Sequence, residues 1–234
     1  MQPYGKAFGL WRKAALTDND GLWDAYTRHQ FVEALRDGTL PLASFLHYLV
    51  QDYVFLVHFS RAYALAVVKS ETLDEMKVAS ATVNALVNIE MQHHVTVCAS
   101  HGIDEKTLFN AVEESANLAY TRYVLDAGYS GDLVDLLAAL APCVLGYGEI
   151  GTRLAQQTSA NNPYTEWIET YASDDYQYVC KEMGELLDSA LERRIGSDFQ
   201  ASPRWQRLTD RFITATRLEV GFWDMSLKPN HKVA

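Results

Sequence analysis

Three side chains that could act as a nucleophile or transfer a proton lie in largely apolar segments of the sequence. Cys143 lies in PCVLGYGEIG, Asp52 in YLVQDYVFLVHF and Glu219 in ITATRLEVGFWDM. A thiolate is a strong nucleophile, and a carboxyl group buried among aromatic rings has a raised pKa that suits acid–base catalysis. A carboxylate at a solvated boundary is the alternative for Asp52 and Glu219, and spacing alone slightly favours it.

The position of Cys143 fits both a reactive and a packing role. Leu136, Leu140 and Cys143 recur at helical spacing, and a lone cysteine on an apolar stripe is usually a small buried hydrophobe. Pro142 removes one backbone hydrogen bond and is expected to kink a helix beside the thiol. Tyr147 follows Cys143 by four residues, so the two side chains share one helix face. Periodicity alone favours packing, whereas a pocket on that face would make the thiol a candidate nucleophile.

The glycines after the cysteine match a dinucleotide-binding spacing. Gly146, Gly148 and Gly151 form G-x-G-x-x-G, which cradles a pyrophosphate where a strand precedes it and a helix follows. The preceding DLVDLLAALAPCVL has its leucines at helical spacing, so a helix is already under way. We therefore expect these glycines to allow close approach of neighbouring helices and not to bind a dinucleotide.

One segment has the spacing of a metal site. Glu90 and His93 form an E-x-x-H unit, which di-iron helical bundles use twice. The sequence contains no second copy. A bundle oxidase with iron is therefore disfavoured, because half of its ligands would be missing, and no metal is expected.

Several of the thirteen tyrosines are candidates for a pocket wall. Tyr120, Tyr123 and Tyr171 each offer a flat face for stacking and a hydroxyl group that needs a partner when buried. For each tyrosine taken alone, packing at a wet rim between helices is the favoured role. The sequence pattern alone therefore leaves both roles open.

Apolar residues at spacings of three and four predict helices along nearly the whole chain. Asp37 and Gly38 are expected to end one helix, and Pro41 lies near the start of the next, which runs on from Ser44. Further helices are predicted over residues 72–100, 104–127, 132–157, 163–171, 173–195 and 202–228. Hardly any segment alternates with the period of two that a strand requires. We predict one all-α domain over residues 1–234 with long antiparallel helices.

Composition narrows the class of partner. The chain has 20 basic and 30 acidic residues and a formal net charge of −10, which argues against a nucleic-acid or anionic-membrane partner. No apolar run reaches the roughly 18 residues that span a bilayer, and the first residues lack the apolar core of a signal peptide. The three cysteines form no C-x-x-C pair. We therefore expect a cytoplasmic protein with reduced thiols.

Four segments, in order and at similar intervals, resemble the TenA/thiaminase II family of the cysteine-containing type. They are HQFVEALRDGTLPLASFLHYLVQDYVFL, PCVLGYGEIG, PYTEWIETYAS and RLEVGFWDM. The resemblance covers nearly the whole chain. It implies an all-α, haem-oxygenase-like bundle that needs no metal or other cofactor and commonly forms a homotetramer.

The resemblance also implies roles for individual residues. The family's nucleophile falls on Cys143, which would attack the pyrimidine carbon next to a ring nitrogen, and Glu219 would handle the proton at that nitrogen. Asp52 would hydrogen-bond the exocyclic amine and the adjacent nitrogen. The substrate-binding aromatic residues would be Phe55, Tyr120, Tyr147, Tyr171 and Phe222. Many relatives have bulky aromatic residues directly after the motif cysteine, where this chain has Val144 and Gly146. The difference predicts a roomier pocket or a closer neighbouring helix.

The implied activity is hydrolysis of a small aminopyrimidine in thiamin salvage. The expected reaction converts 4-amino-5-aminomethyl-2-methylpyrimidine to the hydroxymethyl pyrimidine and ammonia, and cleavage of thiamin at its methylene bridge is a related expectation. The expected partner is thus a small-molecule pyrimidine. The alternative is a non-hydrolytic pyrimidine-binding or regulatory protein on the same bundle.

Overall fold

The computed structural model describes residues 4–159 and 161–228, and within these ranges the chain contains helices and no strand. The α-helices are α1 (Lys6–Thr17), α2 (Leu22–Thr27), α3 (Gln30–Asp37), α4 (Leu42–Lys69), α5 (Leu73–Ala85), α6 (Met91–Ser100), α7 (Glu105–Phe109), α8 (Ser115–Ser130), α9 (Leu133–Ala155), α10 (Thr165–Ala172), α11 (Asp174–Ile195) and α12 (Pro203–Ser226). A π-helical turn, η1 (Leu86–Glu90), joins α5 to α6, and a 3₁₀ turn, η2 (Phe199–Ala201), precedes α12. The prediction of an all-α chain is confirmed.

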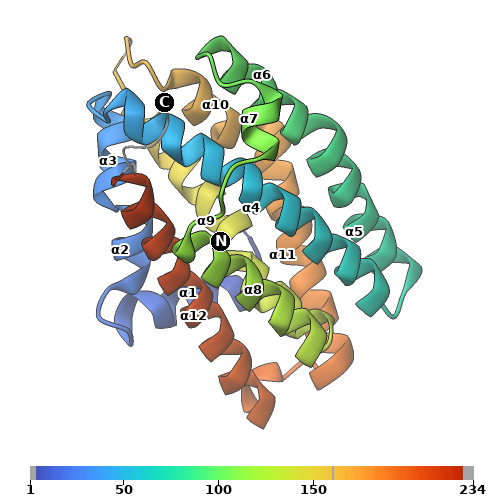
Figure 1. Ribbon diagram of the computed structural model, residues 1–234. Helices are drawn as coiled ribbons and strands as arrows, with labels where there is room; N and C mark the ends of the chain where they lie inside the picture. Colours follow the sequence, from blue (N-terminus) through green and yellow to red (C-terminus); the bar gives the residue numbers. More distant parts are fainter. Residues whose placement is uncertain (1–3, 160, 229–234) are drawn as a thin grey trace.

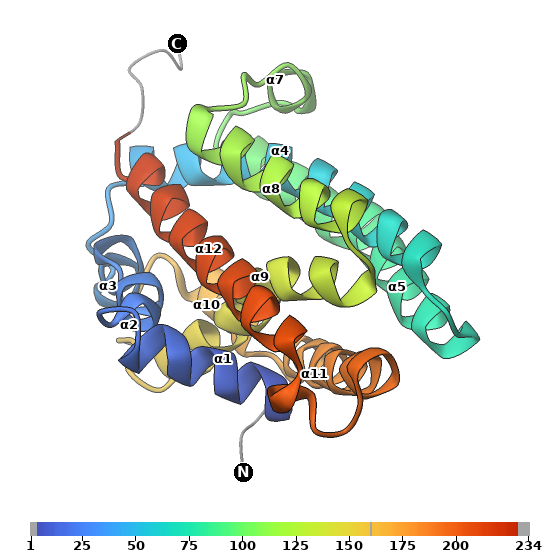
Figure 2. The same cartoon turned by 90° about the horizontal axis from the view of Figure 1, so that it is seen from below.

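Helix α9 is the centre of the bundle. It contacts α8, α10, α11 and α12, and Figure 2 shows α12 crossing over it. Its N-terminus is a capping box, in which the Asp132 side chain accepts hydrogen bonds from the backbone of Val134 and Asp135. By length and composition alone, α9 is apolar enough to cross a membrane, with a mean hydropathy of 1.6. However, 89% of that apolar window is buried inside the protein, as in the core helix of a bundle.

The three glycines of α9 lie where other elements approach it closely. A Cβ atom on Gly146 would lie 2.4 Å from Cε1 of Tyr26, and one on Gly151 would lie 2.5 Å from the backbone carbonyl carbon of Tyr171. Gly148 similarly faces the sulfur of Cys180 at 2.5 Å. The interpretation of these glycines as spacers is confirmed, because they lie inside a helix and contact protein side chains and backbone. Of the two outcomes expected from Gly146, the close neighbour is the one observed.

Two predicted helices have a different local structure. The segment predicted as one helix over residues 104–127 is divided into α7 and α8 by an extended stretch at residues 110–114. That stretch is held by Gln51 of α4, whose side chain donates to the carbonyl oxygen of Val112 at 2.9 Å and accepts from the backbone of Glu114 at 3.1 Å. The segment predicted over residues 72–100 is continuous, but it contains the π-helical turn η1.

Aromatic packing fixes α12 against the N-terminal helices and α4. The Trp223 ring stacks on Phe31 with centroids 4.8 Å apart, and it lies 5.6 Å from Tyr48 and 5.4 Å from Tyr147. Helices α1 and α2, which were not predicted from the sequence, contribute the fully buried Trp11 and Trp23 to the same core. Figure 1 shows α12 running past α1 and α2. This packing sets the position of Glu219, one turn before Trp223.

Candidate active site

A cavity of about 550 Å³ lies between α4, α5, η1, α9, α10 and α11. Cys143 of α9 and Asp52 of α4 both line it, together with Phe55, Tyr147 and Tyr171. The cavity volume is in the range that holds small-molecule ligands. Five of the eight residues predicted for the site therefore contribute to one cavity.

Cys143 lies in α9 directly after the internal proline. The carbonyl oxygen of Pro142 accepts a hydrogen bond from the Tyr26 hydroxyl at 3.1 Å, so a side chain of α2 holds this turn in place. The thiol is half-buried and forms no disulfide. Burial raises the pKa of Cys143 well above its ordinary value, and the negative charges of Glu219, Asp52 and Glu90 raise it further. The thiol is therefore protonated at neutral pH, and its reaction as a nucleophile requires a base.

Aromatic rings form one end of the cavity. Tyr147 of α9 and Tyr171 of α10 meet edge to face with ring centroids 4.9 Å apart. The Tyr171 ring also contacts Trp167 at 4.6 Å and Tyr176 at 4.9 Å. Phe55 of α4 is a further wall residue. Such rings provide flat apolar surfaces suited to a planar ligand.

Asp52 forms a buried polar cluster with two other residues. Its Oδ2 atom accepts a hydrogen bond from the Tyr48 hydroxyl at 3.3 Å and lies 3.2 Å from Nε2 of His94. Burial raises the pKa of Asp52 well above its ordinary value, and the charge of Glu90 raises it further. Burial also lowers the pKa of His94 to about 4. Burial thus favours the protonated form of Asp52 and the neutral form of His94.

The remaining three predicted residues, Glu219, Tyr120 and Phe222, lie behind the cavity wall. The Tyr120 hydroxyl donates to Oε1 of Glu219 at 2.7 Å, and both residues are buried. The ring centroid of Phe55 lies 5.1 Å from that of Tyr120 and 5.8 Å from that of Phe222. None of the three is among the described residues that line the cavity. Their direct contact with a ligand therefore stays a prediction.

The Glu219 carboxyl is set up to hold a proton near neutral pH. Burial raises its pKa to about 8, while the hydrogen bond from Tyr120 acts in the opposite direction. Its charge is also the second-largest cause of the raised pKa of Cys143. Glu219 is thus electrostatically coupled to the thiol and can exchange a proton in the range where an enzyme works.

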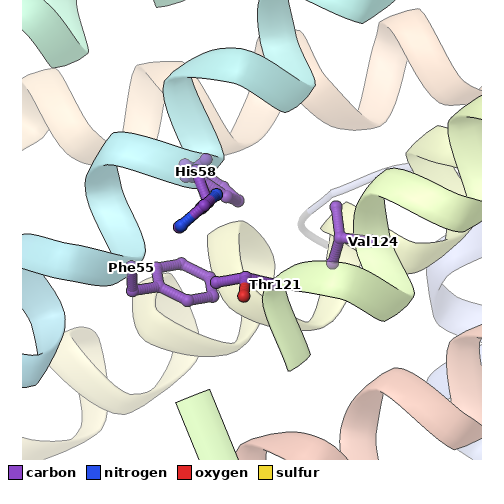
Figure 3. A pocket seen from close by; sticks show the side chains of 5 residues that line it. Phe55, His58, Thr121 and Val124 are labelled. Carbon is purple, nitrogen blue, oxygen red and sulfur yellow. The ribbon is translucent and has the colours of Figure 1, made fainter. Parts of the chain in front are cut away.

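A second, much smaller hollow lies on the other side of Phe55. Figure 3 shows it between α4 and α8, where the His58 and Phe55 side chains face Thr121 and Val124. It leaves no room for a water molecule. It is therefore a packing gap and not a ligand site.

The chain matches a known family over most of its length. The model of the TENA/THI-4/PQQC family matches residues 17–228. The chain belongs to this family. A crystal structure from Silicibacter sp. TM1040, described as a TenA family transcription regulator, is 61% identical, with a TM-score of 0.94 over 97% of this chain and 99% of that one.

Two curated relatives cover most of this chain, and one of them is named for an enzymatic activity. An uncharacterized protein of Haemophilus influenzae is 42% identical over 88% of this chain and 93% of its own length. A protein of Halalkalibacterium halodurans named aminopyrimidine aminohydrolase is 35% identical over 88% of this chain and 90% of its own length. A Shewanella denitrificans domain described as having a heme oxygenase-like fold covers 94% of this chain and 91% of its own, with a TM-score of 0.68 at 16% identity. The predicted fold class and family are thus confirmed.

The structure also brings to the site several residues that the sequence did not predict there. Tyr48 and His94 contact Asp52, and Tyr63, Tyr176 and Met183 line the cavity. Tyr48 precedes Asp52 by one helical turn, a spacing that could have indicated the contact. Nothing in the local sequence pairs Asp52 with His94, which lies on a different helix.

Glu90 and His93, the E-x-x-H unit, line the same cavity. His93 lies at the mouth, where its Nε2 atom is 3.7 Å from Oε1 of Glu166. In the described ranges, no group of three or more His, Cys, Asp or Glu side chains is placed to hold a metal ion. The unit therefore contributes to the cavity wall of this TENA/THI-4/PQQC protein without the ligand set of a di-iron site.

Proposed function

We propose that the protein is an aminopyrimidine aminohydrolase of thiamin salvage. Its substrate would be 4-amino-5-aminomethyl-2-methylpyrimidine, with thiamin as a second substrate that has the same ring. The observation that carries the proposal is the shared cavity: Cys143 and Asp52 line it together with three aromatic residues. Membership of the family and the name of the Halalkalibacterium relative support the same activity.

Asp52 is suited to recognise one edge of the pyrimidine. The exocyclic amine of a 4-aminopyrimidine is a donor and the adjacent ring nitrogen is an acceptor. A neutral carboxylic acid presents one acceptor and one donor, and burial keeps Asp52 in that form because its pKa is well above the ordinary value. Two hydrogen bonds can therefore form without burying a net charge, while the rings of Tyr147, Tyr171 and Phe55 enclose the flat ligand.

The first chemical step joins the thiol to the ring. The sulfur of Cys143 forms a bond to the ring carbon beside the second ring nitrogen, and that nitrogen gains a proton. Glu219 can transfer this proton, because its pKa of about 8 leaves it protonated at neutral pH, and it then takes up the proton that the thiol loses. Total charge is unchanged, so a cavity with little solvent does not have to stabilise a new ion.

The second step releases the substituent on the methylene carbon. Addition of sulfur turns the exocyclic amine and the adjacent double bond into an enamine, whose electron pair expels ammonia from a protonated aminomethyl group. Water then adds to the methylene carbon, and reversal of the sulfur addition frees the hydroxymethyl pyrimidine and the thiol. Asp52 faces the exocyclic amine in this arrangement and can stabilise the positive charge that forms there.

The test is a product assay on the wild type and the Cys143→Ser variant with both pyrimidine substrates. Ammonia and thiazole are measured separately, since they report the two leaving groups. We expect Cys143→Ser to lower turnover by at least about 100-fold, because an alcohol is a much weaker nucleophile than a thiol. Thermal unfolding serves as the control for an intact fold. Undiminished hydrolysis in the variant would contradict the proposal.

A second candidate is a regulatory protein that binds a pyrimidine without hydrolysing it. The description of the 61% identical Silicibacter protein as a transcription regulator favours this function. The protonated resting state of Cys143 is compatible with it, because a thiol is a poor nucleophile. Pyrimidine binding by the wild type with no release of ammonia or thiazole would favour this candidate over the first.

A further inference from the structure

The cavity extends well beyond the aromatic end that contains Cys143 and Asp52. Its other walls come from the α5–η1–α6 segment on one side and from α11 on the other, and α5 contacts both α4 and α11 (Figure 1). This end is lined by small and apolar side chains, among them Ala85, Leu86, Val179 and Met183. A pyrimidine held at the aromatic end would direct its methylene substituent into space that the ring does not fill.

Glu90 is the carboxylate of this second end. It is the last residue of the π-helical turn η1, and π-helical turns occur frequently at functional sites. The turn interrupts a stripe of cavity-lining residues that begins at Val78 on α5 and ends at His93 on α6. Leu86 and Glu90, four residues apart, both line the cavity wall.

The Glu90 side chain has no counter-ion. It forms no hydrogen bond and no ion pair with another residue in the described part of the chain, although burial raises its pKa to about 7. Its charge also raises the pKa of Asp52 and, to a smaller extent, that of Cys143. Because Glu90 lines the same cavity as Cys143 and Asp52, it can act on a ligand bound there. The proposed chemistry of Cys143, Glu219 and Asp52 leaves Glu90 without a role.

A carboxylate in this position is suited to a cation. It lines a largely apolar cavity, in which the other described carboxyl groups are Asp52, assigned above to the pyrimidine edge, and Asp175 and Glu182 nearer the surface. Both proposed substrates have a cationic leaving group: the aminomethyl group is an ammonium ion, and the thiazolium ring of thiamin is a flat cation. Each departs as a neutral molecule when it takes the electron pair of its bond to the methylene carbon.

We propose that Glu90 is the counter-ion of the leaving group and selects pyrimidines whose methylene substituent is positively charged. This inference rests on the proposed function. It explains how the cavity distinguishes substrate from product, since the product has a neutral hydroxyl group in place of the ammonium. A charge-assisted hydrogen bond to Glu90 favours the substrate, and its loss on cleavage helps the product leave.

The test compares two ligands that differ in charge, with turnover prevented by Cys143→Ser. Titration calorimetry measures binding of the aminomethyl and the hydroxymethyl pyrimidine at about pH 8, above the pKa of Glu90 and below that of an alkylamine. We expect a further Glu90→Gln substitution to weaken binding of the aminomethyl ligand by about tenfold. Binding of the hydroxymethyl ligand should change less than about twofold, because a neutral group gains little from the charge.

Two further variants test whether the effect depends on the charge of Glu90. Glu185→Gln removes the same charge from an exposed position of α11 that does not line the cavity, and it should leave the ratio of the two affinities near that of the parent. Glu90→Asp keeps the charge and should retain part of the preference, which guards against a folding defect of Glu90→Gln. Equal weakening of both ligands by Glu90→Gln, or no weakening of either, overturns the inference. Failure of both pyrimidines to bind the Cys143→Ser protein overturns the proposed function, and the inference with it.

Discussion

The Tyr120 hydroxyl donates a 2.7 Å hydrogen bond to Oε1 of Glu219, and neither residue is accessible to solvent. Tyr120 comes from α8 and Glu219 from α12, and both lie behind Phe55 of the cavity wall. The hydrogen bond lowers the pKa of a carboxyl group that burial raises to about 8. The pair therefore controls the proton that the proposed addition to the pyrimidine requires.

Substitution of Glu219 by glutamine should slow the chemical step. Glutamine has nearly the same shape and can accept the hydrogen bond of Tyr120, but it cannot transfer a proton. We expect kcat for ammonia release to fall by about 100-fold or more, the usual range for loss of a general acid. KM should change little, because glutamine keeps the size of the side chain and its hydrogen bond from Tyr120. Steady-state assays of the two proteins measure both constants, and an unchanged kcat would remove Glu219 from the mechanism.

Tyr120→Phe offers a milder test of the same pair. Loss of the hydrogen bond should raise the pKa of Glu219 further, because the Tyr120 hydroxyl lowers it. If protonated Glu219 is the active form, kcat/KM falls as the pH rises through about 8 in the wild type. In Tyr120→Phe that decline should lie at higher pH. A pH profile of both proteins checks this, and a kcat/KM that rises through about pH 8 in the wild type would show that the ionised form is required.

The protonation state of Asp52 can be tested by choice of substitution. An asparagine side chain has one acceptor and donor hydrogens, so it reproduces the hydrogen-bonding pattern of a carboxylic acid. We expect Asp52→Asn to retain pyrimidine binding within about tenfold, whereas Asp52→Ala should weaken it by about 100-fold, through loss of two buried hydrogen bonds. Calorimetric titration with the hydroxymethyl pyrimidine measures both affinities. Equal losses in the two variants would indicate that the ionised carboxylate binds the ring.

The raised pKa of Glu219 should also appear in the pH dependence of stability. Between pH 6.5 and 8 the folded protein keeps a proton on Glu219 that the unfolded chain loses, so the free energy of unfolding falls as pH rises. The slope is at most about 1.4 kcal/mol per pH unit for one group. Asp52 and Glu90 act in the same direction because their pKa values are also raised. His94 acts in the opposite direction, but only below its ordinary value of 6.5, because its pKa is lowered.

In Glu219→Gln this decline in stability should be shallower and not absent. Urea unfolding at the two ends of the pH window gives the slope for each protein. Glu185→Gln is the matched control, because Glu185 is exposed and its Oε1 atom lies 3.8 Å from Nζ of Lys181. This variant should keep the wild-type slope. An identical slope in wild type and Glu219→Gln would mean that Glu219 is ionised in the folded protein.

Helical periodicity was enough to predict α9 and the shared face of Cys143 and Tyr147, because both depend on residues close in sequence. It also predicted the spacer role of the glycines, which follows from their place inside a helix. Helical periodicity did not predict which side chains contact one another at the site. Asp52 meets His94 across two helices, and Tyr120 lies 99 residues before Glu219. Such pairs depend on how the helices pack against one another. Local sequence patterns therefore do not show whether a carboxyl group is buried or exposed to solvent.

The break between α7 and α8 was missed for a related reason. Residues 104–127 have helical spacing, but Gln51 of α4 binds the backbone of Val112 and Glu114 within the break. In addition, the Asn117 side chain donates to the carbonyl oxygen of Gln51 at 2.7 Å. A distant side chain thus satisfies backbone groups that a continuous helix would have paired locally. Helical propensity in the segment is overridden by tertiary contacts.

Close packing at Gly146 gives a prediction about stability next to the proposed nucleophile. A Cβ atom there would lie 2.4 Å from Cε1 and 2.7 Å from the hydroxyl of Tyr26, a fully buried residue that also binds the backbone of Pro142. Gly146→Ala must displace this ring, so we expect a loss of about 1–3 kcal/mol in the free energy of unfolding. Gly221→Ala in α12 is the control, because nothing lies within 4 Å of its added Cβ, and it should be neutral or stabilising by up to about 1 kcal/mol. Urea unfolding of the two variants measures both effects, and a Gly146→Ala protein as stable as the wild type would show that Tyr26 can move without cost.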